Sequence, residues 1–176
     1  MENIASLFLQ TAVKRFAVYK DLGDKTFAQL PETDFYFQPN NASNSIALII
    51  QHMNGNMRSR WTNFLTEDGE KEWRHRDTEF ENNKYSKEEL LAMWEQGWRC
   101  LFDALAALKE EDLLKTIYIR TEPLSVMDAI HRQLAHYPYH VGQLVYLGRL
   151  IANEQWKSLS IAKGKSSEYN RQMENK

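Results

Sequence analysis

Four stretches of the chain carry apolar residues at every third or fourth position, which is the spacing of one face of an α-helix. The first covers residues 3–22 and is expected to end near Gly23. The second is expected to begin at Ser43 or Ser45, because either side chain can cap a helix, and to run to Phe64. The pattern therefore predicts two amphipathic helices before residue 65.

The third and fourth apolar stretches each open with a capping box, a serine followed three residues later by an acidic side chain. The two boxes are Ser86 with Glu89 and Ser125 with Asp128. Helices are therefore predicted over residues 86–108 and 126–152. Pro138 lies inside the last of them, where a proline removes one backbone hydrogen bond and is expected to kink the helix.

The connections between these helices differ in character. Residues 24–42 hold prolines, asparagines and scattered aromatic side chains, which is typical of an irregular loop packed over a core. Residues 66–85 are rich in charged side chains and predict a solvated loop, which could include a short ordered segment around Trp73. Residues 116–120 alternate and are partly β-branched, which predicts a short extended segment. The tail loses the helical period after Asn153, and from about residue 163 it is expected to be partly mobile.

Together these elements predict an all-α protein that forms a single domain over residues 1–176. Its 43% hydrophobic and 26% charged residues are usual for a soluble globular protein. The formal net charge of −2, without a basic stripe, argues against a nucleic-acid partner. The N-terminus lacks the features of a signal peptide, and no uncharged apolar run is long enough to span a membrane. We therefore expect a cytoplasmic protein with no membrane contact.

Cys100 is the only cysteine, so neither an intramolecular disulfide nor a cysteine-based zinc site can form. It lies in an apolar helical stretch, where a buried and unreactive thiol is expected. The protein is therefore not expected to supply a catalytic nucleophile of its own.

His136 and His140 are four residues apart in the last predicted helix, so their imidazoles lie on one face and can bind the same metal ion. A third ligand must come from elsewhere. His131 lies about 140° around the helix from His136 and points away, while His75 stands between two arginines, which disfavours a cation. His52, in the second helix, is the remaining candidate. The same position also suits a histidine on the flank of a core helix with its polar edge in water.

Three imidazoles around one ion leave a fourth position open, as in reactive rather than structural zinc sites. The metalloprotease motif His-Glu-x-x-His is excluded, because Tyr137 occupies the place of the glutamate that acts as general base. An isolated pair at this spacing also occurs for structural reasons. Here the pair continues into Gln143 on a long helix, which favours a metal site.

Three segments make the chain resemble the DinB-like superfamily of bacterial four-helix bundles. They are HYPYHVGQL at residues 136–144, IQHM at residues 50–53 and WKSLSIAKGKS at residues 156–166, the last typical of a largely uncharacterised subgroup. The resemblance implies a four-helix bundle with a long crossover connection, frequent homodimers, and a divalent ion bound by His52, His136 and His140. Some members of the superfamily are thiol-dependent S-transferases, others are similar to metal-dependent isomerases or hydrolases, and many have no known activity.

Three functions are compatible with such a site. In the first, a thiol S-transferase used in detoxification, the ion lowers the pKa of a low-molecular-weight thiol, which then attacks a small electrophile. In the second, the ion activates water and the protein hydrolyses a small substrate. In the third, the histidines form a polar cluster in a non-catalytic dimeric bundle.

Asn56 and Gln143 each lie about one helical turn from a histidine, and we expect them to orient a ligand histidine or the substrate. The alternative is that they are ordinary polar residues on helix flanks. Three imidazoles suit zinc or nickel best here, and also iron or copper. The five tryptophans and eight tyrosines exceed what one small core readily hides, which favours a homodimer.

Overall fold

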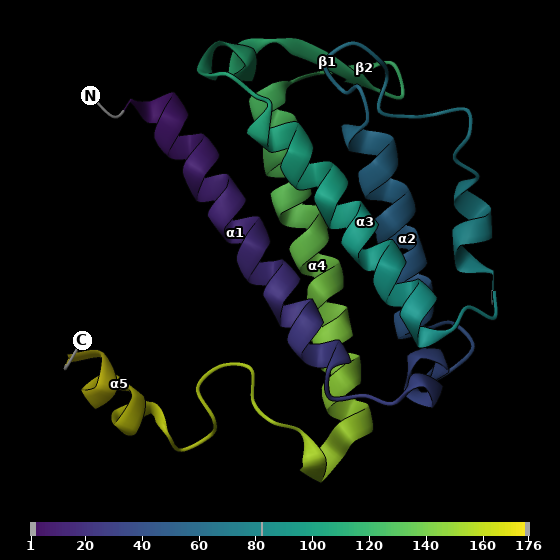
Figure 1. Ribbon diagram of the computed structural model, residues 1–176, viewed down its shortest axis with the longest axis vertical. Helices are drawn as coiled ribbons and strands as arrows, with labels where there is room; N and C mark the ends of the chain where they lie inside the picture. The colour runs from purple at the N-terminus through teal and green to yellow at the C-terminus, as the bar shows by residue number, and fades with distance from the viewer. Residues whose placement is uncertain (1–2, 82, 175–176) are drawn as a thin grey trace.

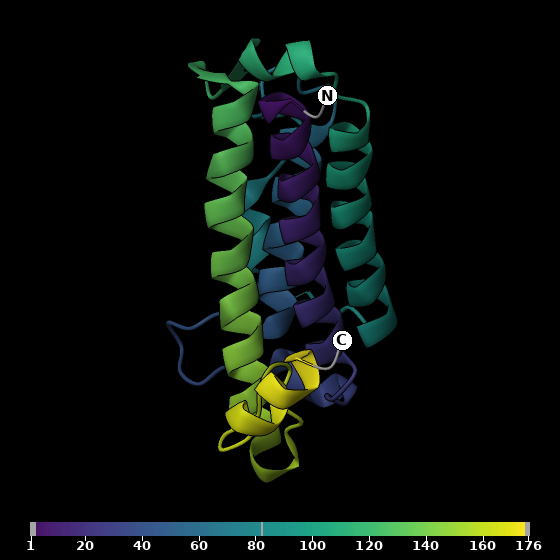
Figure 2. The same ribbon diagram turned by 90° about the vertical axis from the view of Figure 1, so that its left-hand side faces the viewer.

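In the computed structural model, which describes residues 3–81 and 83–174, four long helices lie side by side (Figure 1 and Figure 2). They are α1 (Ile4–Phe27), α2 (Ile46–Trp61), α3 (Lys87–Ala106) and α4 (Val126–Ala152). Helix α2 packs mainly against α3, and α1 mainly against α4. The chain is mostly helical, as the apolar pattern predicted, and all four predicted helices are present.

Each long helix begins at a polar side chain that accepts a hydrogen bond from a backbone N–H group of the first turn. The capping side chains are Asn3, Ser45, Ser86 and Ser125. The capping box of α3 is complete, because the Glu89 carboxylate accepts in turn from the backbone N–H of Ser86 at 2.7 Å. The starts of these helices therefore depend on local side-chain chemistry.

Helix α1 continues through Gly23 to Phe27, so the prediction that it ends near residue 23 is wrong. Gly23 is buried against α3, and an added Cβ would overlap the indole of Trp94. The indole N–H of Trp94 also donates to Oδ1 of Asp24 at 2.7 Å. The glycine allows α1 and α3 to pack closely and does not stop the helix.

Helix α4 contains Pro138 and still runs as one helix from Val126 to Ala152 (Figure 2). The proline therefore does not end the helix. Because the helix is continuous, His136 and His140 stay on consecutive turns of the same element, and their side chains project to the same side.

Tyr137 fixes α4 against α2 at the level of these histidines. Its side chain is fully buried, and its hydroxyl accepts a hydrogen bond from Nε1 of Trp61 at 3.1 Å. The same hydroxyl donates to Oδ1 of Asn56 at 3.1 Å. Both partners belong to α2, so these bonds hold the two helices in register where their polar faces meet.

The connection between α2 and α3 is not the solvated loop that its charged residues predicted. It contains the 3₁₀-helix η2 (Arg76–Phe80), which packs on α2. Three charged side chains of the connection are buried, and they are Lys71, Arg74 and Glu79. Ion pairs compensate this burial: Lys71 contacts Glu67 at 2.6 Å, and Arg74 contacts Glu79 at 2.7 Å. The charge-rich segment therefore forms a packed wall beside α2.

A small two-stranded sheet leads into α4. Strands β1 (Thr116–Ile119) and β2 (Glu122–Ser125) are antiparallel, and only the first was predicted. The turn residues Arg120 and Thr121 have φ angles of 55° and 64°, which residues other than glycine rarely adopt. Their backbone N–H groups donate to the Asp68 carboxylate at 2.8 and 2.7 Å. The α2–α3 connection thus holds the turn in place.

The remaining elements are short. They are η1 (Glu32–Tyr36), η3 (Glu110–Leu114), η4 (Asn153–Gln155) and α5 (Ser166–Glu174). Helix α5 has no buried residue and lies apart from the four long helices (Figure 1). Among the residues that the structure describes, no helix combines the length and the apolar character needed to cross a bilayer.

Candidate metal centre

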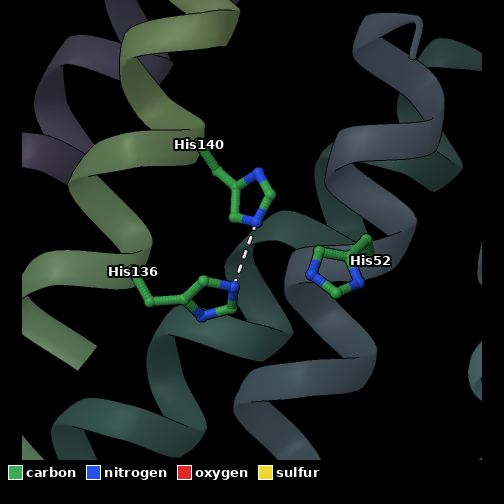
Figure 3. Close-up of side chains that lie close together, drawn as sticks. All are labelled: His52, His136 and His140. Atoms are coloured by element: carbon green, nitrogen blue, oxygen red, sulfur yellow. Dashed lines mark hydrogen bonds between the residues drawn. The ribbon is translucent and has the colours of Figure 1, made fainter. Parts of the chain in front are cut away.

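His52 of α2 and His136 and His140 of α4 point toward one another in the space between the two helices (Figure 3). One ring nitrogen of each lies within 4.8 Å of the corresponding nitrogen of the other two. His52 is buried, with 5% of its surface exposed, and the other two are half-buried. The structure therefore brings together the α4 pair that the helical spacing selected and His52, which followed from the exclusion of the other histidines and from the resemblance.

The outer nitrogen of each ring contacts an oxygen of a neighbouring side chain. Nδ1 of His52 lies 2.9 Å from Oε2 of Glu79. Nδ1 of His136 lies 3.2 Å from Oε1 of Gln133, and Nδ1 of His140 lies 3.0 Å from Oε1 of Gln143. A proton on Nδ1, donated to such an oxygen, leaves the lone pair of the ring on Nε2. In this tautomer all three rings can present Nε2 as a metal ligand.

The inner nitrogens of the α4 pair face each other at hydrogen-bonding distance (Figure 3). Nε2 of His136 and Nε2 of His140 are 3.1 Å apart. Burial, together with the neighbouring His140 and His52, lowers the pKa of His136 to about 3. Burial also lowers the pKa of His140. At neutral pH both rings are therefore uncharged, which is the form of histidine that binds a metal ion.

Acid is expected to destabilise the metal-free protein through this site. The pKa of His136 falls from its ordinary value of 6.5 to about 3, so between these pH values the unfolded chain binds a proton that the folded chain does not. Stability should therefore fall as the pH drops from 7 to 5. Urea unfolding at both pH values should show a larger loss for the wild type than for His136→Gln, which lacks the titrating ring. Equal losses would contradict the assigned environment.

Glu79 ties the α2–α3 connection to the cluster. Besides contacting His52, its carboxylate accepts hydrogen bonds from Arg74, from Nε at 2.7 Å and from Nη2 at 3.0 Å. Burial raises the pKa of Glu79, but the hydrogen bonds from His52 and Arg74 outweigh burial and lower the pKa overall. A charged carboxylate behind a histidine increases the basicity of the ring as a metal ligand.

Gly55 gives the Glu79 carboxylate room to reach His52. An added Cβ at position 55 would overlap Oε1 and Cδ of Glu79. Gly55→Ala is therefore expected to displace the carboxylate and to weaken zinc binding about tenfold or more, as is usual for loss of a group behind a ligand. Zinc titration against a competing chelator measures this. Gly142→Ala is the matched control, because a Cβ there contacts nothing within 4 Å; a similar loss in both variants would contradict the role of Gly55.

The three histidines line a cavity of about 480 Å³ between α2, α4 and the α2–α3 connection. A second cavity of about 760 Å³ adjoins it along α4, and the two share Asn44, Tyr139 and Gln143 as lining residues. A small molecule can therefore reach the imidazoles from solvent.

A family model described as "Protein of unknown function (DUF1572)" matches residues 3–165. The chain belongs to this family. No curated protein gives a significant match to it. The match of this DUF1572 chain covers α1 to α4 and all three clustered histidines. Family membership assigns no activity, so the function has to be argued from the geometry of the site.

The other two histidines and the cysteine lie outside the cluster. The ring of His131 packs against Phe8 of α1, with 5.1 Å between ring centroids, as its helical position predicted. His75 is exposed at the start of η2. Cys100 is half-buried on α3, where its Sγ lies 3.6 Å from Oγ1 of Thr62. No thiol of the described chain therefore reaches the cluster.

The two predicted orienting residues occupy different positions. Gln143 contacts Nδ1 of His140, and it lines both cavities. Asn56 lines the smaller cavity and binds Tyr137, not a histidine. Two further side chains beside the ligands were missed, Gln133 and Glu79. Gln133 lies three residues before His136, so the helical spacing could have predicted its contact with that ring. Nothing in the charged segment singled out Glu79.

Proposed function

We propose that this protein is a metal-dependent enzyme whose divalent ion is bound by His52, His136 and His140. The observation that carries the proposal is the convergence of the three rings, each with Nδ1 next to an oxygen acceptor. Each ring brings one nitrogen within 4.8 Å of the other two, as a shared metal ion requires. Three imidazoles that line a cavity open to small molecules fit a catalytic site with a free coordination position better than a closed structural one.

The three nitrogen donors limit which metal ion the site can bind. Three neutral nitrogen ligands suit zinc or nickel, with iron and copper as alternatives, and they do not suit magnesium or calcium, which prefer oxygen. When bound, such an ion lowers the pKa of a thiol or of water and so provides a nucleophile near pH 7. Gln143 and Glu79 would hold the rings in the orientation that this chemistry needs.

The reaction that we favour is transfer of a low-molecular-weight thiol to a small electrophile, as a detoxification step. It is supported by the lack of a protein thiol at the cluster among the described residues and by two adjoining cavities, which leave room for two substrates. Hydrolysis of a small substrate is the alternative, favoured by the polar character of the cavity around the histidines.

We also propose a DinB-like four-helix bundle with a long crossover, and a homodimer. The fold is supported by the pairing of α1 with α4 and of α2 with α3, together with the long α2–α3 connection. The dimer is supported by three large side chains that α4 leaves exposed, Tyr139, Tyr146 and Leu150. Light scattering on the purified protein tests the dimer directly.

Thiol dependence separates the two reactions. Zinc-loaded and nickel-loaded protein should conjugate cysteine or 2-mercaptoethanol to 1-chloro-2,4-dinitrobenzene faster than the metal-free protein, and His140→Ala should not. A metal-dependent turnover of 4-nitrophenyl acetate without added thiol would favour the hydrolase instead. If neither reaction depends on the metal, the enzyme proposal is not supported for these substrate classes.

A further inference from the structure

Five arginines surround the cavity in front of the histidines. They are Arg60, Arg74, Arg76, Arg120 and Arg132. The chain as a whole has a net charge of −2, so this concentration of positive charge is a local property. Among the described residues that line the cavity there is no aspartate or glutamate. The cavity therefore presents a strongly positive wall next to rings that are themselves neutral.

Part of this charge is neutralised behind the wall. Arg60 donates to the backbone carbonyl of Gly69 and to Oε2 of Glu70, and Arg120 donates to the same Glu70 oxygen at 2.8 Å. The single carboxylate of Glu70 thus pairs with two guanidinium groups. The carboxylate of Glu79 pairs with Arg74 and also contacts His52. The two carboxylates therefore leave positive charge uncompensated at the cavity.

Two of the arginines have little or no carboxylate contact. Arg76 lies 4.0 Å from the fully exposed Asp77, at the limit of an ion pair, and otherwise stacks over Phe80. Arg132 is exposed on α4, one turn before His136, and takes part in none of the ion pairs found among the described residues. Both guanidinium groups are free to contact a ligand that enters the cavity.

Arg74 supplies an independent indication of a missing partner. Its side chain is only 2% exposed, and Nη1 has no hydrogen-bond partner in the described structure, while Nε and Nη2 are occupied by Glu79. A buried charged donor without an acceptor is unfavourable and rare in folded proteins. Because Arg74 lines the cavity, an oxyanion bound there is the natural acceptor for this group.

From this arrangement we infer that the cavity binds a substrate with an oxyanion group, a carboxylate or a phosphate, which Arg74, Arg76 and Arg132 hold beside the three-histidine site. The inference rests on the proposed function and specifies its substrate class. Guanidinium groups pair with either anion through two parallel hydrogen bonds, and such pairs are shorter and stronger than neutral ones. A divalent ion at the histidines adds further positive charge, so an anionic substrate is favoured over a neutral or cationic one.

A pair of thiols tests the inference by binding alone. Cobalt-loaded protein is titrated with 3-mercaptopropionate and with 2-mercaptoethanol, which differ in the carboxylate, and binding is followed by the cobalt–thiolate absorption band. We expect the carboxylated thiol to bind about tenfold tighter or more, the usual gain from charge-assisted hydrogen bonds. Arg132→Gln should lose most of this preference. Arg149→Gln, which removes a charge from the exposed end of α4 outside the cavity, should keep it.

Competition by inorganic phosphate and by acetate distinguishes the two anions: the better competitor against 3-mercaptopropionate identifies the preferred oxyanion. Equal affinity for both thiols in the wild type, with no competition by either anion, would overturn the inference and leave the metal site intact. If neither thiol produces the band, the thiol reaction fails instead. In that case, calorimetric titrations with inorganic phosphate and with acetate test the inference. Binding of either anion that weakens in Arg132→Gln supports the inference. Binding of neither anion, or binding that Arg132→Gln leaves unchanged, overturns it.

Discussion

Replacing His140 by alanine is expected to abolish stoichiometric metal binding. The ring supplies one of three nitrogens that lie within 4.8 Å of one another. Among the described residues, no other histidine, cysteine, aspartate or glutamate could replace it as the third ligand. Loss of a group that only supports a ligand already costs about 10- to 100-fold in affinity, so loss of the ligand itself should cost more than about 100-fold. Zinc titration of the metal-free protein against a competing chelator measures the affinity.

His131→Ala is the matched control for this experiment. It removes an imidazole from the same helix, but one that packs on Phe8 and points away from the cluster. It should bind zinc with the affinity of the wild type. Retained stoichiometric zinc in His140→Ala, or equal losses in the two variants, would contradict the assignment of the ligands.

Glu79→Gln is expected to weaken both metal binding and the fold. The variant removes the negative charge behind His52, which should reduce zinc affinity about 10- to 100-fold. It also leaves the guanidinium of Arg74, which is 2% exposed, without its carboxylate. Breaking a buried pair on one side costs about 3–5 kcal/mol of unfolding free energy. Urea unfolding of the metal-free protein measures the second effect and zinc titration the first.

A double variant separates the two effects of Glu79. Glu79→Gln combined with Arg74→Met removes the buried charge together with its partner, so much of the stability should return. Zinc affinity should stay low, because His52 still lacks its carboxylate. Full zinc affinity in Glu79→Gln would show that Glu79 has no influence on the metal site.

Local periodicity was sufficient to predict the four long helices and the α4 pair of histidines. His136 and His140 follow from the four-residue spacing, and the exclusion of His131 follows from its angle around the same helix. The pairing with His52 could not be predicted from periodicity, because the pattern of one helix does not show how far it lies from another. The exclusion of His131 and His75 and the family resemblance supplied that step, and the structure brings His52 to the α4 pair.

The parts that were predicted incorrectly depend on contacts between distant segments. Gly23 resembles a helix stop, yet it is needed where α1 meets Trp94. The charged segment after α2 resembles a solvated loop, yet Arg74 and Glu79 neutralise each other and become buried beside α2. Gly55 was not singled out from the sequence, because its role depends on the position of Glu79. In each case the environment of the residue depends on a neighbour distant in the sequence, which the local pattern cannot identify.

Metal content is the most direct test of the three-histidine site. The untagged protein and its His52→Ala variant should be purified without chelators and measured in parallel by inductively coupled plasma mass spectrometry. We expect about one divalent ion per chain in the wild type, and none in the variant, because a three-nitrogen site does not survive the loss of one ligand. If the wild type carries no ion and added zinc or nickel does not raise its melting temperature, the histidines are structural and the enzyme proposal is wrong.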